Sequence, residues 1–423
     1  MSRLAVFAGV RTPFGKAGGA LRDLYAEDLA ALAIRELILR TGVDAAALDG
    51  VVVGNVGQGA RAANVARVAA LLAGVPHRVP AWTVHRNCAS GFEAVSQAAD
   101  QLAARRGRLW ISVGVESMSN YPLEYGDAAR AFFERLSRAK TAAARLRALS
   151  RWRPTMLKPR VALLEGLRDP VAGLGMGQTA ELLAREWNVT REEQDAFAAE
   201  SHRRALAARE KLREETCDVV SATAHLRDDE GVRTESTPER LARLKPVFER
   251  SHGTVTAGNS SQVTDGAVAL LVGDDAAGRA FGLAPLGYVE RFAYAALEPE
   301  RMGLGPAYAI DRLYDGAEVP WSRIDLVEIN EAFAAQVLAC LRAASDAEWC
   351  REELGRGRPL GPIPTDRLNV NGGAIALGHP VGASGARLIL TSLLELRRRN
   401  AERALVSLCV GGGQGGAFEL AVS

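Results

Sequence analysis

The first 115 residues alternate between two hydrophobic patterns. Continuous apolar runs at Leu4–Val10, Gly50–Gly54 and Leu109–Val115 are typical of buried strands. Apolar residues at helical spacing predict helices over Asp28–Arg40 and Asn64–Ala73. Strand and helix in alternation predict a layered α/β domain with a mostly parallel sheet.

A turn of small residues around Cys88 follows the short extended segment Trp82–His85. The apolar residues after it recur at helical spacing: Phe92, Val95, Ala99 and Leu102. Cys88 is therefore predicted to sit where a helix begins, where unpaired N–H groups and a partial positive charge favour a reactive thiolate. A lone cysteine is more often a small buried apolar residue, so this hypothesis depends on the rest of the chain.

The second half of the chain repeats the order of the first. Ala89–Gly91 opens a helix that leads to the run Arg108–Val113, and Ala383–Gly385 opens one that leads to Arg403–Leu408. We interpret this order as duplication of one α/β unit.

Residues 120–254 interrupt the alternation. Thr190–Glu193 is a capping box that predicts a helix running to about Arg213. Residues 130–168 combine many arginines with large apolar residues: Phe132, Phe133, Leu136, Leu146, Leu149, Trp152, Met156 and Leu157. This pattern fits peripheral contact with an anionic membrane, a partner subunit, a solvated helical face over a substrate channel, or the phosphates of a nucleotide-bearing substrate.

Composition narrows the class of protein. The chain has 423 residues, 48% of them hydrophobic, and a net charge of +2, so two to three domains and no nucleic-acid partner are expected. Five cysteines without a CxxC pair suggest neither a disulfide framework nor a metal site. The first residues lack the apolar run of a signal peptide and no stretch is long enough for a membrane span, so we expect a cytoplasmic protein.

Two glycine-rich segments near the C-terminus carry further chemistry. NVNGGAIALGHPVGASGAR places His379 in a loop before a helix, and CVGGGQGG begins with Cys409 after a buried strand. Each residue alone would more often be structural. Together with Cys88 they form a set of two thiols and one imidazole among glycines that let a substrate approach closely.

These segments and several others resemble the thiolase family, the acyl-CoA C-acyltransferases, over nearly the full length. The matching motifs stand in the family's order: NCASG at 87–91, GVESMS at 114–119, GMGQTAE at 175–181, TAGNSSQVTDGA at 256–267, MGLGP at 302–306, NEAFA at 330–334, GGAIALGHPVGASGAR at 372–387 and CVGGGQG at 409–415.

The resemblance implies an α/β thiolase fold. Two duplicated βαβαβαββ halves would form a layered α-β-α-β-α core with an inserted loop domain. It would assign residues 1–119 with 255–285 to the N-terminal half, 120–254 to a loop domain for CoA and acyl binding, and 286–423 to the C-terminal half.

The resemblance also implies roles for the three reactive residues. Cys88 would attack the thioester carbonyl carbon of a 3-ketoacyl-CoA, with His379 as general base, leaving an acyl group on Cys88 and releasing acetyl-CoA. Cys409, whose thiol we expect to titrate not far above neutrality, would protonate the enolate fragment and, in the reverse direction, deprotonate acetyl-CoA.

Binding roles follow from the same resemblance. Asn330, through a water, and His379 would line one oxyanion hole, and the backbone amides of Cys88 and Gly411, or a neighbour in 411–413, the other. Ser261 would touch the pantetheine arm of CoA. The residues expected to flank the acyl pocket are Met176, Met302 and Phe333, although periodicity alone favours core positions for them.

The first functional hypothesis is a 3-ketoacyl-CoA thiolase of fatty-acid β-oxidation that uses CoA as substrate and no cofactor. It would be a homodimer or homotetramer, with a hydratase/dehydrogenase subunit as a possible partner. An insertion after Arg342 and the basic segment resemble thiolase subunits of fatty-acid oxidation complexes, although those usually carry His at position 330; His85 also departs from the family's usual Asn.

Two alternatives stay open. The first is an acetyl-CoA acetyltransferase that makes acetoacetyl-CoA, which Gly175 disfavours because short-chain biosynthetic members carry His there. The second is a non-catalytic CoA-binding or membrane-binding subunit, which the presence of Cys88, His379 and Cys409 disfavours.

Overall fold

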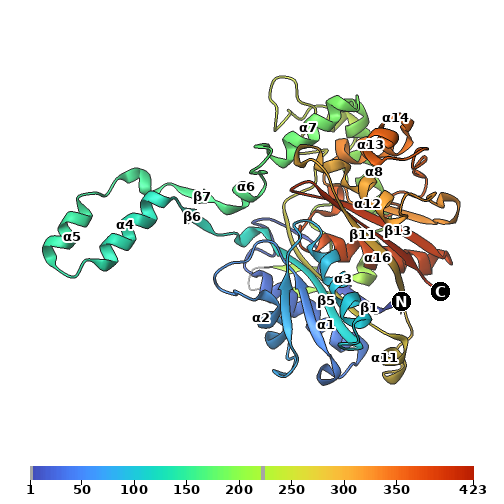
Figure 1. Ribbon diagram of the computed structural model, residues 1–423, viewed down its shortest axis with the longest axis horizontal. Helices are drawn as coiled ribbons and strands as arrows, with labels where there is room; N and C mark the ends of the chain where they lie inside the picture. The colour runs from blue at the N-terminus through green and yellow to red at the C-terminus, as the bar shows by residue number, and fades with distance from the viewer. Residues whose placement is uncertain (1–2, 221–223) are drawn as a thin grey trace.

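The computed structural model describes residues 3–220 and 224–423. The predicted N-terminal half includes residues 1–2 and the predicted loop domain includes residues 221–223, and these five residues lie outside the described residues. Its centre is a ten-stranded sheet in which nine strands follow the order β12-β13-β14-β11-β1-β10-β5-β3-β4 and β2 (Gly15–Lys16) pairs with β10 (Figure 1). The bounds of these nine strands are β1 (Leu4–Arg11), β3 (Gly50–Gly54), β4 (Ala81–Val84), β5 (Leu109–Ser117), β10 (Thr264–Gly273), β11 (Gly287–Ala296), β12 (Leu326–Ile329), β13 (Arg403–Val410) and β14 (Gln414–Ala421).

The sheet consists of two halves joined where the start of β1 pairs with β11. In the N-terminal half β10, β5 and β3 follow β1, and in the C-terminal half β14, β13 and β12 follow β11 in the corresponding order. The predicted duplication is confirmed. The expected mostly parallel sheet is wrong: among the described strands, parallel pairing joins β3 to β4 and β5, and β12 to β13. A strand that is buried on both faces, such as β10, has a continuous apolar sequence whether its neighbours are parallel or antiparallel, so the sequence pattern does not show strand direction.

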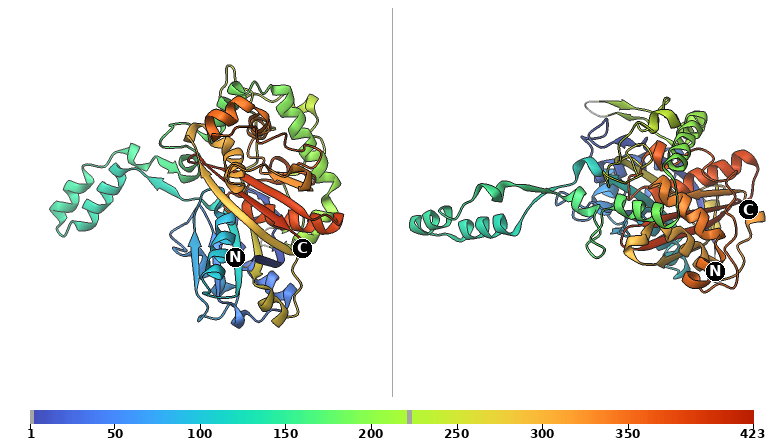
Figure 2. Two further views of the ribbon diagram at one scale, coloured as in Figure 1. Left: turned by 45° about the vertical axis from the view of Figure 1, so that its right-hand side comes forward. Right: turned by 90° about the horizontal axis from the view of Figure 1, so that it is seen from above.

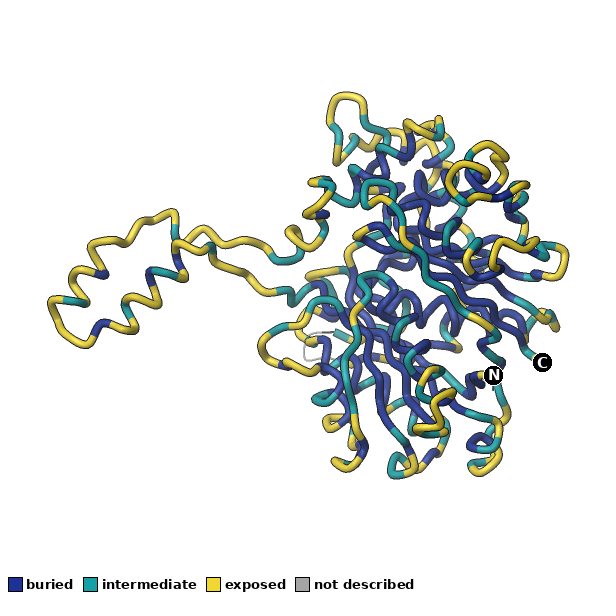
Figure 3. The backbone as a smooth tube through the Cα atoms, viewed as in Figure 1, coloured by how far each residue is buried: buried dark blue, intermediate teal, exposed yellow. Residues whose placement is uncertain are grey.

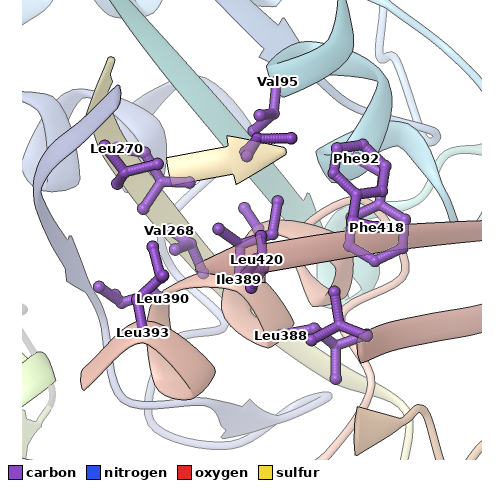
Figure 4. Packing of buried hydrophobic residues seen from close by; sticks show 14 of the residues in the cluster. Phe92, Val95, Val268, Leu270, Leu388, Ile389, Leu390, Leu393, Phe418 and Leu420 are labelled. Atoms are coloured by element: carbon purple, nitrogen blue, oxygen red, sulfur yellow. The ribbon is translucent and has the colours of Figure 1, made fainter. Parts of the chain in front are cut away.

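The two halves of the sheet and the helices that lie outside and between them form five layers. Contacts place α1 (Ala26–Thr41) and α2 (Val65–Leu72) on the outer face of the N-terminal half, and α12 (Gly305–Leu313) on the outer face of the C-terminal half. α3 (Ser90–Ala103) and α16 (Ser384–Arg399) pack together between the halves. Phe92 of α3 lies 4.3 Å, centroid to centroid, from Phe418 of β14 (Figure 4). The α-β-α-β-α layering is therefore confirmed.

Two helix boundaries differ from expectation. The helix after Cys88 begins at Ser90 rather than at the cysteine. The capping box at Thr190 is confirmed, since its side chain accepts the N–H of Glu193, but α8 (Arg191–Ala207) ends before the predicted limit. Ala208 has non-helical backbone angles and separates α8 from α9 (Arg209–Glu215).

Residues 122–166 form an arm that projects from the body in every view (Figures 1 and 2). The antiparallel strands β6 (Leu123–Tyr125) and β7 (Pro159–Val161) form its stem and carry the paired helices α4 (Asp127–Arg138) and α5 (Ala142–Leu149). The short helix α6 (Ala162–Gly166) leads back to the body. Most of the arm is exposed (Figure 3).

The remaining helices and strands lie on the body: α7 (Met176–Glu186), β8 (Val219–Val220), β9 (His225–Leu226), α10 (Pro238–Leu241), α11 (Asp275–Ala280), α13 (Ala334–Ser345), α14 (Ala347–Leu354) and α15 (Ala374–Leu377). None of the described helices is long and apolar enough to span a membrane. The three-part domain division at residues 119, 254 and 285 stays a prediction.

Candidate active site

Cys88 lies in the loop between β4 and α3, and this loop is tied to the glycine loop after β13. Asn87 adopts a left-handed backbone conformation with φ of 42°. Its side-chain amide donates to the carbonyl of Gly411 at 2.6 Å. The hydroxyl of Ser90 accepts the N–H of Arg86 and donates to the carbonyl of Asn87, which closes the turn. The two loops that surround the sulfur are thus held in one arrangement.

Burial determines the protonation state of both thiols. Burial raises the pKa of Cys88, and the N–H groups of Gly411 and of Cys88 itself, which donate to the sulfur, oppose this only in part. Burial also raises the pKa of Cys409 well above its ordinary value, and the neighbouring Cys88 adds to the shift. The expectations of a preformed thiolate at Cys88 and of a near-neutral pKa at Cys409 are wrong, because desolvation outweighs the effect of a helix that begins two residues later.

His379 is buried in the loop between α15 and α16, and its hydrogen bonds identify its tautomer. Its Nδ1 lies 2.6 Å from the hydroxyl of Ser384. That hydroxyl already donates to the carbonyl of Pro380 at 3.1 Å, so it accepts the proton from Nδ1. Nε2 is left with its lone pair, 3.5 Å from the amide nitrogen of Asn330. Burial, with a smaller contribution from Arg387, lowers the pKa of His379 to about 4, so the imidazole is neutral at pH 7.

A buried carboxylate fixes the segment that follows His379. Glu116, at the end of β5, accepts the N–H of Gly382 at 3.1 Å, of Val56 at 3.1 Å and of Gly57 at 2.9 Å. A Cβ at Gly382 would lie 2.2 Å from a backbone oxygen, so only glycine fits this approach. Burial raises the pKa of Glu116 to about 7, while these N–H donors oppose the shift. Glu116 therefore links three segments beneath the site.

The three reactive residues line one cavity of about 530 Å³. Four of the predicted binding residues line the same cavity: Ser261, Met176, Met302 and Phe333. Asn330 is fully buried beside His379, and Gly411 lines an adjoining cavity that shares Cys88. The structure therefore brings all nine predicted residues to one region, although they lie on both halves of the fold.

Sequence reasoning missed several residues that shape this region. Phe248 lines the cavity and packs edge-to-face on Phe333 at 6.0 Å between ring centroids, and Gln178 adds a polar group. Ser384 could have been found from its position in the GHPVGASG segment, five residues after His379. No motif pointed to Phe248.

The other side chains do not form a second centre of this kind. Within residues 3–220 and 224–423, no three His, Cys, Asp or Glu side chains are grouped so as to hold a metal ion. Cys217, Cys340 and Cys350 are buried away from the cavity lining.

Comparisons with known proteins cover the whole chain. The family described as "Thiolase, N-terminal domain" matches residues 4–276, and "Thiolase, C-terminal domain" matches residues 283–422. A protein named 3-ketoacyl-CoA thiolase from Pseudoalteromonas translucida is 38% identical over 423 residues, covering 99% of this chain and 96% of the relative. One from Pectobacterium atrosepticum is 39% identical, covering 100% of this chain and 97% of the relative.

Solved structures agree with the sequence relatives. The human mitochondrial 3-ketoacyl-CoA thiolase in complex with CoA is 32% identical, with a TM-score of 0.84 over 100% of this chain and 98% of that one. The Bacillus anthracis acetyl-CoA acetyltransferase is 34% identical, with a TM-score of 0.85 over 100% of this chain and 99% of that one. With the domain matches, the fold and these relatives in agreement, the chain belongs to the thiolase family.

Proposed function

We propose that the protein is an acyltransferase that cleaves 3-ketoacyl-CoA with CoA, giving acetyl-CoA and a shortened acyl-CoA, as a reversible Claisen condensation. The observation that carries this function is the meeting of Cys88, His379 and Cys409 in one cavity. Full-length similarity to relatives named 3-ketoacyl-CoA thiolase supports the degradative substrate. CoA serves as substrate, and no further cofactor is required by this chemistry.

The first half of the reaction starts from a neutral thiol and a neutral imidazole. Nε2 of His379 accepts the proton of Cys88 as the sulfur attacks the keto carbon C3. Attack at C3, rather than at the thioester carbon, is required because only cleavage of the C2–C3 bond releases acetyl-CoA. The electron pair of that bond stays on C2, and the Cys409 thiol protonates C2. The raised pKa of Cys409 suits this role, because the residue begins the step carrying its proton.

The second half returns every proton to its origin. The Cys409 thiolate takes the proton of the CoA thiol, and the CoA sulfur attacks the acyl carbon on Cys88. The bond from Cys88 to that carbon breaks, and the cysteine sulfur recovers its proton from the His379 imidazolium. The enzyme then carries two thiols and a neutral imidazole again.

Fixed N–H donors surround the positions where oxygen becomes negative. The amides of Gly411 and Cys88, which point at the sulfur, would stabilise the oxyanion that forms on C3. Asn330 and His379 would stabilise the enolate oxygen of acetyl-CoA. Oδ1 of Asn330 is buried and has no hydrogen-bond partner among the described residues, which supports the proposal that this amide acts through a bound water.

An assay of 3-ketoacyl-CoA thiolysis tests the proposed function. The reaction is started with CoA and monitored as the loss of the enolate absorbance of the 3-ketoacyl-CoA. The alternative is an acetyl-CoA acetyltransferase, a name carried by the Bacillus anthracis neighbour. Incubation with acetyl-CoA alone, with acetoacetyl-CoA as the measured product, distinguishes the two. Condensation that outpaces thiolysis of every longer substrate would favour the alternative.

Ser384→Ala is expected to lower kcat about tenfold with little change in KM, because one neutral hydrogen bond that selects the His379 tautomer is lost. Without the acceptor, the proton can move to Nε2 and the base is removed. The same variant should slow alkylation of Cys88 by iodoacetamide between pH 6 and pH 8. Wild-type His379, with its pKa lowered to about 4, stays in the base form throughout that range.

Two further variants separate tautomer control from packing. Ser384→Thr keeps the hydroxyl and should restore most of kcat. Ser392→Ala, on the same helix, removes a buried hydroxyl that has no partner among the described residues, and should leave kcat unchanged. A Ser384→Ala variant that lost thermal stability but kept its wild-type kcat would contradict the assignment.

A homodimer is supported by β4, whose four residues are half-buried at an edge of the sheet. The opposite edge strand, β12, is paired by residues 367–369. An open strand edge commonly pairs with another chain. A homotetramer, association with a hydratase/dehydrogenase subunit, a role in fatty-acid β-oxidation and a cytoplasmic location remain part of the proposal.

The arm is proposed to contact an anionic membrane surface. Between the two strands of its stem, the exposed large apolar side chains are Phe133, Leu146, Leu149, Trp152 and Leu157, and arginines and lysines are interspersed with them along the chain. Charge reversal of Arg145, Arg147 and Arg151 to Glu should weaken binding to vesicles that contain anionic phospholipid by about 100-fold or more. Thiolysis of acetoacetyl-CoA should not change, because none of the three arginines lines the cavity of Cys88, and α5, which carries Arg145 and Arg147, lies at the outer end of the arm (Figure 1).

Vesicle flotation with two lipid compositions provides the control. Zwitterionic vesicles should bind wild type weakly, and charge reversal of the exposed body residues Arg105, Arg279 and Arg323 should preserve most of the binding to anionic vesicles. Equal loss in both triple variants would show that net charge alone matters and would contradict a specific role for the arm.

A further inference from the structure

The turn that carries Gly411 is a hairpin loop made only of glycine. β13 ends at Val410 and β14 begins at Gln414, and these two residues pair across the strands, so Gly411–Gly413 closes the hairpin. Gly412 and Gly413 have φ of 89° and 76°, a left-handed conformation that favours glycine. Glycine also has the greatest backbone freedom of any residue, so this loop has no stiffness of its own. The proposed oxyanion donor at Gly411 therefore needs support from outside the loop.

Hydrogen bonds from two other segments provide that support. At the end of the loop, the carbonyl of Gly413 accepts the N–H of Leu297 at 2.8 Å. At its start, the carbonyl of Gly411 accepts the side-chain amide of Asn87 at 2.6 Å. A carbonyl can only accept, so the nitrogen of the Asn87 amide is the atom that faces it. The residue next to the nucleophile thus holds the residue whose N–H points at the sulfur of Cys88.

The backbone of Asn87 is fixed without help from its side chain. Its carbonyl accepts the hydroxyl and the N–H of Ser90, at 2.7 and 3.0 Å. Its N–H donates to Nδ1 of His85 at 3.4 Å. Its φ of 42° lies in the left-handed region, which asparagine tolerates better than most residues. Loss of the side-chain amide should therefore free Gly411 while leaving the turn that presents Cys88 in place.

We propose that Asn87 is a positioning residue of the oxyanion hole, and that its amide keeps the N–H of Gly411 directed at the oxygen of the acyl group that bonds to Cys88. This assignment rests on the proposed function. Asn87 takes no proton and forms no bond to the substrate. It acts through Gly411 in each step in which that acyl carbon becomes tetrahedral, because fixed donors stabilise developing charge without first having to reorganise.

A merely structural link between the two loops would behave differently in two reactions of Cys88. Acetylation by acetyl-CoA passes through a tetrahedral oxyanion, because the sulfur adds to a carbonyl carbon. Alkylation by iodoacetamide displaces iodide from a saturated carbon, so no oxyanion forms. Both reactions need the sulfur to be in place and to lose its proton. The ratio of the acetylation rate to the alkylation rate therefore reports on the oxyanion hole rather than on the nucleophile.

Asn87→Gly removes the amide at a φ that glycine adopts without strain. We expect kcat for thiolysis to fall by about 30-fold with little change in KM, less than the roughly 100-fold or more that follows removal of an oxyanion donor itself. The rate of acetylation should fall at least about tenfold more than the rate of alkylation. Mass spectrometry of the protein at timed intervals measures both rates.

Two further variants separate the hydrogen bond from the flexibility that glycine adds. Asn87→Asp keeps the shape of the side chain but places a carboxylate oxygen against the carbonyl of Gly411, so it should lower the ratio of the two rates at least as much. Asn188→Gly replaces another left-handed asparagine, with φ of 50°, which is exposed after α7 and lines neither cavity at Cys88. It should leave kcat and the ratio unchanged.

The ratio of the two rates also separates the two levels of the proposal. A wild-type ratio in Asn87→Gly or in Asn87→Asp, whether or not both rates fall, would overturn the positioning role and leave the thiolase function standing. An equal fall of the ratio in Asn188→Gly would do the same. A wild-type enzyme that is alkylated at Cys88, but neither becomes acetylated nor cleaves any 3-ketoacyl-CoA, would overturn the proposed function itself.

Discussion

Replacing Cys88 with alanine should lower kcat for thiolysis by at least about 1000-fold, because no acyl-enzyme can form without the sulfur. The side chain is half-buried in a loop and packs at the margin of the hydrophobic core, so its replacement by alanine leaves the core residues themselves in place. Thermal stability should therefore stay close to that of the wild type. Mass spectrometry after incubation with acetyl-CoA should find an acetylated wild-type protein and an unmodified variant.

Cys217→Ala provides the matched control for Cys88→Ala. Cys217 is also a free thiol, but it is buried in the hydrophobic core against α1 and the N-terminal half of the sheet. Its loss should change stability slightly and leave kcat intact. Full activity in Cys88→Ala, or equal inactivation in both variants, would refute Cys88 as the nucleophile.

Three strands of the N-terminal half were predictable because their runs are almost entirely apolar. The runs at residues 4–10, 50–54 and 109–115 became β1, β3 and β5, each extended by at most two residues. Strand direction was not predictable, because a strand buried on both faces shows no alternation that distinguishes its neighbours. The mixture of arginines with apolar residues such as Phe133 and Leu146 likewise predicted a basic amphipathic stretch, but could not tell whether its apolar side chains pack on the body or project from it.

The candidate site, like the fold, could be predicted from the sequence only in part. Motifs identified the chemical groups at positions 88, 379 and 409, but their protonation states depend on burial, which is a tertiary property. Glu116 illustrates the limit most clearly. The backbone N–H groups that donate to it lie about 60 residues before it in sequence and 266 residues after it. No local sequence pattern could therefore assign Glu116 the role of holding Gly382 beneath His379.

Cys409→Ala should separate the two halves of the reaction. Acylation of Cys88 by acetyl-CoA needs His379 but no proton transfer at C2. The CoA sulfur can leave as a thiolate without the proton that Cys409 would give it, so the variant should still become acetylated, more slowly than the wild type. Exchange of the acetyl methyl protons with deuterated solvent should slow by about 100-fold or more, because the group that removes a proton from C2 is gone. Nuclear magnetic resonance of acetyl-CoA incubated with each protein measures that exchange.

Cys340→Ala is the control for this experiment, since Cys340 is a fully buried thiol close enough to raise the pKa of Cys409. Its sulfur donates to the carbonyl of Gly303 and lies outside the cavity lining, so exchange should continue at nearly the wild-type rate. Continued exchange in Cys409→Ala would show that another base removes the proton from C2. His379 would then be the remaining candidate within the cavity, and the division of roles between one imidazole and two thiols would have to be abandoned.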